Sequence, residues 1–199
     1  MRPRINVQAA ARYEWVQRLA HQVKDGEPDG IDRAVEIMTR LVWNLYYQIY
    51  VLVPVPGRSG RADYTKVIAE RVAKNLGIQC VDCLVTEPHE PLYDVKLRGG
   101  ELKLPEFRMT KQFPPDQGIL FIDNVFDTGT TARAVYATLN ENLAACASYC
   151  VLAFTPTYKQ YDNVKVHLPI LPPRLFDSYP ANLPRFDYVN GCMKFENEN

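Results

Sequence analysis

The residues most able to do chemistry in this chain stand close together between Ile119 and Thr131. Four apolar residues lead to Asp123-Asn124, and residues 127–131 then read Asp-Thr-Gly-Thr-Thr. The apolar run predicts a buried strand that ends at the carboxylate of Asp123, and the polar turn predicts the start of a helix. Successive backbone N–H groups in such a turn, together with hydroxyls and a flexible glycine, can bind a phosphate monoester.

Asp123 would face whatever is attached to that phosphate. A carboxylate accepts hydrogen bonds from two hydroxyls, so a ribose diol is a natural partner. The simpler interpretation is an Asp and Thr cap on an ordinary helix, but a cap needs only one such side chain. Two other phosphate-binding patterns do not occur in the sequence, namely GxxxxGK[ST] and a GxGxxG that follows a strand.

A second loop with suitable chemistry follows the short apolar run Tyr50 to Val55. It contains Gly57, Arg58 and Arg61, and guanidinium groups are well suited to bind phosphate groups. The alternative is a solvated loop with two surface arginines. A second phosphate loop in the same domain favours the functional interpretation.

Strands alternating with helices from about residue 50 to residue 168 predict an α/β fold, with a parallel central sheet flanked by helices. Ligands in such folds bind beyond the carboxyl ends of the strands. We expect a single domain whose core spans about 50–168. The first 49 residues predict a helical extension, because Ala9, Tyr13, Val16, Ala20 and Val23 recur at helical spacing. The proline-rich segment 169–199 has no function that the sequence reveals.

The expected elements of the core are strands at 78–85, 119–122, 147–154 and 164–168, and a helix from about 130 to 142. The long connection Thr86 to Gly118 predicts a functional lid or an inserted hairpin. Among its cations, Arg108 and Lys111 are the favoured candidates for groups that such a lid would bring to the site. A disordered surface loop is the alternative.

Residues Ile119 to Thr131 resemble the signature of the type I phosphoribosyltransferases: four hydrophobic residues, two acidic positions and a phosphate loop that contains Thr-Gly. The loop after Val55 is similar to the Pro-Val-Pro segment of the amidotransferase-like and competence-protein-like branch of that family. The resemblance covers roughly Val51 to Phe154. It implies a Rossmann-like phosphoribosyltransferase fold with an accessory hood region built from a chain terminus.

The resemblance also implies a role for each matching position. Thr128, Gly129, Thr130 and Thr131 would bind the 5-phosphate of 5-phosphoribosyl-1-pyrophosphate (PRPP). Asp123 and Asn124 would bind the ribose, although the family has an acid where Asn124 stands. Gly57, Arg58 and Arg61 would bind the pyrophosphate. Asp127 would act as base or hydrogen-bond partner toward a purine-like acceptor, and the alternative is an acid that only favours the helix dipole.

The function implied is transfer of a phosphoribosyl group from PRPP to a nucleobase, with release of pyrophosphate. Mg²⁺ would be held mainly by oxygens of the substrate, with Asp123 as an additional contact, and the assembly would be a homodimer. Two alternatives remain open. One is a non-catalytic regulator that binds PRPP or a nucleotide in the same pocket. The other is an enzyme that acts on a different phosphorylated pentose.

The bulk properties of the 199 residues fit a folded protein in the cytoplasm, since 47% are hydrophobic and no signal peptide is recognisable. The formal net charge is +0, which gives no reason to expect nucleic acid as a partner. No apolar stretch is long enough to span a membrane. The Cys80-Val-Asp-Cys83 motif suggests a zinc site or a redox pair, but buried thiols are the favoured interpretation because a strand would point the two thiols to opposite faces.

Overall fold

The computed structural model of the chain describes residues 4–45, 51–90, 95, 97–99, 106–114, 117–155, 163–169, 171, 176, 185–187 and 192–194. The main elements are β1 (Ile5–Arg12), α1 (Tyr13–Lys24), α2 (Pro28–Trp43), β2 (Val51–Pro54), α3 (Tyr64–Leu76), β3 (Gln79–Cys80), β6 (Ile119–Phe126), α5 (Thr130–Tyr136), α6 (Glu141–Cys146), β7 (Ala147–Phe154) and β8 (Val164–His167). Two short strand pairs accompany them, namely β4 (Leu84–Thr86) with β5 (Phe107–Met109), and β9 (Arg185–Asp187) with β10 (Cys192–Lys194).

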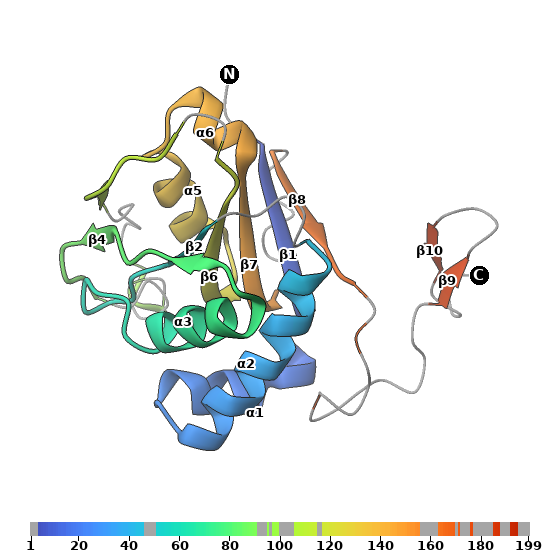
Figure 1. Cartoon of the computed structure of the whole chain (residues 1–199). Helices are drawn as coiled ribbons and strands as arrows, with labels where there is room; N and C mark the ends of the chain where they lie inside the picture. Colours follow the sequence, from blue (N-terminus) through green and yellow to red (C-terminus); the bar gives the residue numbers. More distant parts are fainter. Residues whose placement is uncertain are drawn as a thin grey trace.

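A six-stranded sheet in the order β3-β2-β6-β7-β1-β8 forms the centre of the molecule (Figure 1). Every neighbouring pair in it is parallel. The central strand β2 and the first half of β6 are buried on both sides and therefore consist entirely of apolar residues, whereas the edge strands β3 and β8 are partly exposed. The expected α/β fold with a parallel central sheet flanked by helices is confirmed.

The two faces of the sheet pack against different elements. Leu120 and Ile122 of β6 pack with α1, α2 and α3, which Figure 1 shows grouped together. Ile119 and Phe121 point the other way, toward α5, α6 and the β4–β5 pair. This alternation follows from the two-residue period of a strand. The alternation holds from Ile119 to Ile122 and reverses at the end of β6, where Val125 packs on the α1–α3 side and Phe126 on the α5 side.

The chain leaves the ends of β2 and β6 in opposite directions. After β2 it passes through α3 on one face to β3 at the edge of the sheet, and after β6 it passes through α5 and α6 on the other face to β7. Adjacent parallel strands whose connections diverge in this way leave a crevice between their carboxyl ends. That crevice is where an open α/β sheet binds its ligand.

The expected helical extension at the N-terminus is wrong for residues 5–12, which form β1 inside the central sheet, paired with β7 on one side and β8 on the other. The central sheet therefore begins at residue 5 and not near residue 50. The three alanines Ala9, Ala10 and Ala11 favour a helix locally, but pairing on both sides outweighs that propensity. The alternation Ile5-Asn6-Val7-Gln8 was the signal for a strand.

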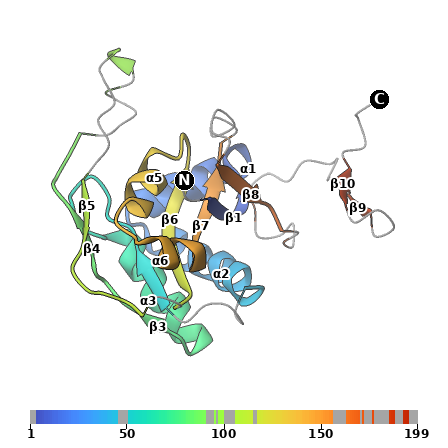
Figure 2. The ribbon, with the colours of Figure 1, turned by 90° about the horizontal axis from the view of Figure 1, so that it is seen from above.

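Two other expected elements are interrupted. The helix predicted for 130–142 is two short helices, because the side chain of Asn140 caps a new helix by accepting a hydrogen bond from the Leu143 N–H at 2.9 Å. The strand predicted for 78–85 is broken between β3 and β4. There the chain leaves the central sheet and enters the antiparallel β4–β5 pair, whose strands lie side by side in Figure 2.

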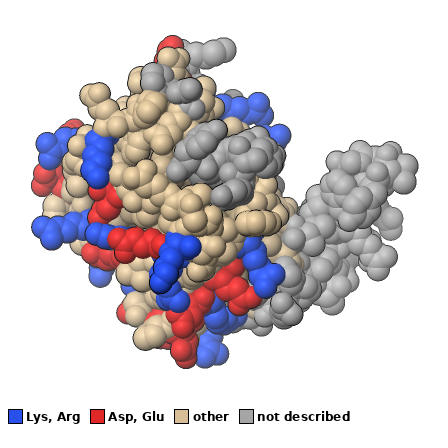
Figure 3. All heavy atoms as spheres, in the orientation of Figure 1, with Lys and Arg blue, Asp and Glu red and all other residues tan. Residues whose placement is uncertain are grey.

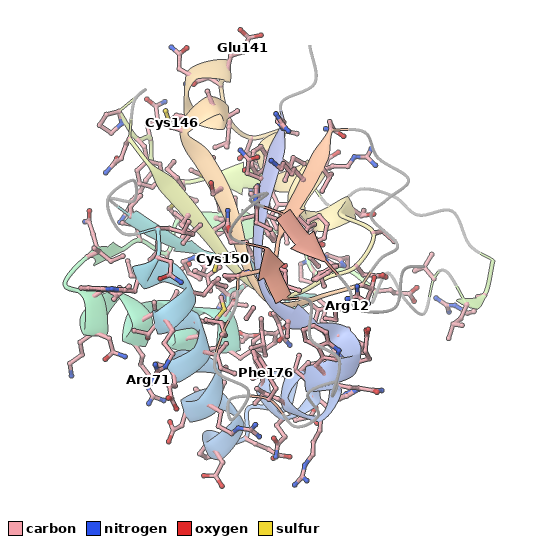
Figure 4. All side chains as sticks on the ribbon, turned by 90° about the vertical axis from the view of Figure 1, so that its right-hand side faces the viewer. Arg12, Arg71, Glu141, Cys146, Cys150 and Phe176 are labelled. Atoms are coloured by element: carbon pink, nitrogen blue, oxygen red, sulfur yellow. The ribbon has the colours of Figure 1, made fainter. Side chains whose placement is uncertain are left out.

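The β4–β5 pair bears on the connection 86–118, for which a lid or an inserted hairpin was predicted. Its described residues form an inserted hairpin base in which Leu84 and Phe107 are buried against the sheet. In the proline-rich segment, Leu171 and Phe176 are buried in the core formed with α1 and α2, and Figure 4 shows Phe176 beside these helices. Most of 169–199 lies outside the described residues. None of the described helices is long and apolar enough to cross a membrane.

Candidate functional site

The strand that carries the predicted site residues Asp123 and Asn124, β6, borders the crevice and is longer than expected. It was predicted to end at Asp123 and instead continues to Phe126. Val125 and Phe126 are apolar, so they extend the buried strand by pairing with Ala153 and Phe154 of β7. Asp123 and Asn124 are therefore consecutive residues within one strand, and their side chains point to opposite faces of the sheet.

Asp123 lies on the α5 side and is half-buried. Its Oδ2 accepts a hydrogen bond from the Tyr149 hydroxyl at 2.7 Å, and its Oδ1 accepts one from the Asn124 N–H at 2.7 Å. Burial raises the pKa of Asp123 to about 6, although both hydrogen bonds act to lower it. A carboxylate has about four acceptor positions. Asp123 therefore keeps capacity for two hydroxyls of a ligand while its orientation is fixed.

Asn124 lies on the other face, and this overturns its predicted role in ribose binding. Its side chain is buried, and Nδ2 donates a hydrogen bond to the carbonyl oxygen of Ala20 in α1 at 3.0 Å. Its Oδ1 has no hydrogen-bond partner among the described residues. Asn124 thus attaches helix α1 to the sheet and does not share the crevice with Asp123.

The loop after β6 has the geometry of a backbone cradle. Gly129 has φ +77°, and a Cβ built there would lie 3.0 Å from the ring of Phe126, so both the backbone and the packing favour glycine. The Thr128 and Thr130 hydroxyls are 2.7 Å apart, and the Thr130 N–H approaches Thr128 Oγ1 at 3.4 Å. Thr131 follows in the first turn of α5, half-buried. The predicted 5-phosphate residues are therefore brought together in one turn.

Asp127 begins this loop and is exposed. Its Oδ1 accepts a hydrogen bond from the Thr155 hydroxyl at 2.5 Å, and the Thr155 N–H donates to the carbonyl of Phe126 at 2.9 Å. The end of β7 thus holds the start of the loop. A solvent-accessible carboxylate held in one orientation can accept a proton or a hydrogen bond from a ligand.

The loop after β2 is joined to the same crevice, since the Val55 N–H extends the pairing of β2 with β6 by donating to Ile122 at 2.9 Å. Gly57 and Gly60 close a tight turn through a backbone hydrogen bond of 3.0 Å. Gly60 has φ +83°, and a Cβ there would lie 2.4 Å from the Thr86 carbonyl oxygen. Arg58 and Arg61 are exposed on this turn, where their charges are available to an anion.

Two tyrosines that the sequence did not single out complete the site. Tyr149 donates to Asp123, as described above. Tyr64 is the first residue of α3, directly after the arginine loop. Burial, followed by the negative charges of Asp123 and Asp63, raises the pKa of the Tyr64 phenol, whereas Arg58 lowers it. Tyr64 therefore lies near both Asp123 of β6 and Arg58 of the loop after β2. Neither tyrosine belongs to a local sequence motif.

The favoured cations of the connection 86–118 lie beside β5. Arg108, in β5, is exposed and lies 4.0 Å from Glu87 Oε1 through its Nη2. Lys111 follows β5 and is exposed. Neither is shown in contact with the two loops.

Figure 3 shows acidic and basic side chains intermixed over the part of the surface formed by α1, α2 and α3, in keeping with the formal net charge of +0.

The two thiols of the Cys80-Val-Asp-Cys83 motif differ in exposure, since Cys83 is buried and Cys80 is half-buried. Burial raises the pKa of both Cys80 and Cys83 to about 11, so the thiols stay protonated at neutral pH. Cys150 is fully buried in β7, where Figure 4 shows it facing α2. Within the described part of the chain, no group of three or more His, Cys, Asp and Glu side chains could hold a metal ion.

No family model matches the chain, and no curated protein matches it. Among solved structures, the chain is similar to a purine phosphoribosyltransferase from Pyrococcus horikoshii, with a TM-score of 0.45, 19% identity, and coverage of 70% of this chain and 81% of the other. It is also similar to an adenine phosphoribosyltransferase from Leishmania tarentolae, with a TM-score of 0.43, 17% identity, and coverage of 71% and 70%. At such low identities and TM-scores the similarity concerns only the general shape of the fold. The description of the fold therefore depends on the parallel sheet itself.

Proposed function

We propose that this protein is a phosphoribosyltransferase, which transfers the 5-phosphoribosyl group of PRPP to a nucleobase, with a purine-like base favoured, and releases pyrophosphate. One observation supports this proposal above all others. A half-buried carboxylate, Asp123, lies at the crevice between a Thr- and Gly-containing turn and a Gly- and Arg-containing turn. The three groups match the ribose, the 5-phosphate and the pyrophosphate of the donor.

The backbone of residues 128–131 would bind the 5-phosphate through its N–H groups, which the left-handed conformation of Gly129 allows to approach an anion. Asp123 would accept hydrogen bonds from the ribose hydroxyls with its two remaining acceptor positions. Arg58 and Arg61 would stabilise the pyrophosphate as it leaves with its negative charge. Asn124 has no part in this mechanism.

The reaction breaks the bond between the anomeric carbon and pyrophosphate and forms a bond from that carbon to a nitrogen of the base. The transition state has the character of an oxocarbenium ion, so the protein acts by positioning and by stabilising charge. Asp127 would accept the proton of the nucleophilic nitrogen or hold the base by a hydrogen bond. Thr155 keeps Asp127 in place for that role.

Mg²⁺ would accompany the donor and reduce the repulsion between its phosphate oxygens. The ion would be held mainly by the donor's own oxygens, and Asp123 would add one carboxylate oxygen from its unused acceptor positions. The arginines of the loop after β2 and the backbone of residues 128–131 would bind the remaining negative charge.

The protein would be a dimer in the cytoplasm, by analogy with the family that its signature resembles.

The proposal is tested by calorimetric titration of the protein with PRPP and Mg²⁺, beside a Thr128→Ala/Thr131→Ala variant. Micromolar binding that this variant loses is the expected result, and pyrophosphate release on addition of a purine base identifies the enzyme. Binding without release for any nucleobase would point to a regulator that senses PRPP. Absence of binding in the unaltered protein would refute both functions.

A further inference from the structure

A cluster of four aromatic residues lies beneath the proposed site, on the α5 side of the sheet. It consists of Phe121 and Phe126 of β6, Tyr136 of α5 and Tyr149 of β7, all of them buried. The ring of Tyr149 lies 6.2 Å from Phe121 and 6.0 Å from Phe126, measured between centroids. Phe121 also contacts Tyr136, with centroids 6.1 Å apart. These are the separations of favourable aromatic pairs.

The register of the sheet directs the Tyr149 hydroxyl to Asp123. Tyr149 pairs with Phe121, two residues before Asp123 on the same face of β6. A long aromatic side chain reaches such a diagonal neighbour on the next strand. The phenol is almost completely buried, and burial raises its pKa, so it remains protonated and donates to the carboxylate. Tyr149 consequently has one hydrogen-bonding task that the structure identifies, which is to hold Asp123 Oδ2.

We propose that Tyr149 is a positioning residue for sugar recognition: its hydroxyl holds the Asp123 carboxylate in the orientation that accepts the ribose hydroxyls. This inference rests on the proposed function of Asp123. The same cluster supports the phosphate loop, because Phe126 lies against both Tyr149 and Gly129. The cluster thus sets the spacing between the groups that bind the ribose and the 5-phosphate.

Tyr136 provides a matched control for Tyr149. Both tyrosines are buried in the cluster, but the Tyr136 hydroxyl donates to the carbonyl oxygen of Ala147 at 2.9 Å and not to Asp123. Tyr136→Phe and Tyr149→Phe each remove one buried hydroxyl and keep the ring. Tyr136→Phe therefore shows how much of a change in sugar recognition follows from the loss of a buried hydroxyl in this cluster alone.

The test compares ribose 5-phosphate with 2-deoxyribose 5-phosphate by calorimetry. The unaltered protein and Tyr136→Phe should prefer ribose 5-phosphate, and Tyr149→Phe should lose roughly tenfold of that preference. Equal preference in all three proteins would overturn the role of Tyr149 and leave the proposed function standing. Failure of the unaltered protein to bind either sugar phosphate would overturn the proposed function, and with it this inference.

A double variant keeps the proposal testable if Tyr149→Phe does not fold. In Asp123→Asn/Tyr149→Phe the carboxylate that loses its donor is also removed, so the buried charge no longer opposes folding. If Tyr149 acts through Asp123, the double variant and Asp123→Asn must show the same preference for ribose 5-phosphate over 2-deoxyribose 5-phosphate. An additional loss in the double variant would show that Tyr149 acts by another route and would overturn the inference.

Discussion

Asp123 and Asn124 are neighbours in the chain, yet they belong to two different regions of the molecule. Asp123 lies on the α5 side of the sheet, beside the crevice, with hydrogen bonds that fix it and acceptor positions left for a ligand. Asn124 lies on the α1 side, buried, with its amide bonded to the backbone of Ala20. The first is placed to bind a ligand, and the second joins a helix to the sheet.

This difference shows that two adjacent polar residues in a sequence signature need not both bind the ligand. The side-chain contacts separate the two residues, since Asp123 is bonded to Tyr149 on the α5 side and Asn124 to Ala20 on the α1 side. An amide suits the buried position better than a carboxylate, since it has a donor for the Ala20 carbonyl and no charge to desolvate. The predictions below test the two sides of β6 separately, from the largest expected effect to the smallest.

On the ligand side, Asp127→Asn should lower turnover by about 10²–10⁴-fold while leaving PRPP affinity unchanged, because the amide cannot accept the proton of the base. Pyrophosphate release measured with a purine acceptor gives turnover, and calorimetry gives affinity. Glu141→Gln, which alters an exposed acid of α6, is the control and should behave like the unaltered protein. Normal turnover in Asp127→Asn would remove the assigned role.

On the α1 side, Asn124→Asp should destabilise the fold by about 3 kcal/mol at pH 8, because it places an unpaired carboxylate against the Ala20 carbonyl. Urea unfolding measures the loss. Burial raises the pKa of such a carboxylate, so the loss should shrink as the pH is lowered and the group becomes protonated. A stable Asn124→Asp protein with higher PRPP affinity would mean that this position does face the ligand.

The ionisation of Asp123 gives a third test. Its pKa is raised to about 6, against an ordinary value of 3.8, so the folded state binds the proton more tightly than the unfolded chain does. The resulting stabilisation is complete below pH about 4 and is lost as the pH rises through about 6. Relative to Asp123→Asn, the unaltered protein should therefore lose about 2–3 kcal/mol of unfolding free energy between pH 4 and pH 7. A stability difference that does not vary with pH would contradict the burial of this carboxylate.

The smallest expected effect concerns the phosphate loop. Gly129→Ala should cost about 1–2 kcal/mol for the left-handed backbone, with a further loss from contact with Phe126. Gly26→Ala is the matched control, because Gly26 has φ +74° and a Cβ there would meet no atom within 4 Å. In thermal unfolding, Gly129→Ala should have a lower melting temperature than Gly26→Ala. Only Gly129→Ala should also weaken phosphate binding. The reverse ranking would mean that Phe126 does not constrain the loop.

The parts of this architecture that depend on local sequence could be predicted. The strand at 119–122, the turn at 127–131 and the strand at 147–154 follow from apolar runs and from turn chemistry. The partners of these elements could not be predicted. Tyr149 reaches Asp123 from a neighbouring strand, 26 residues away in the chain, and only the sheet register brings the two together. β1 was missed because its alanines have the propensity of a helix, whereas two neighbouring strands determine its conformation.

The measurement that tests the account most directly is a calorimetric titration of three proteins with PRPP and Mg²⁺: the unaltered chain, Asp123→Ala and Asn124→Ala. Removing Asp123 should weaken binding by at least about tenfold, because hydrogen bonds to a charged group are lost. Removing Asn124 should leave the affinity of the folded protein unchanged while it lowers the thermal stability. Equal losses of affinity in the two variants, or a larger loss in Asn124→Ala, would contradict the assignment of the two sides of β6.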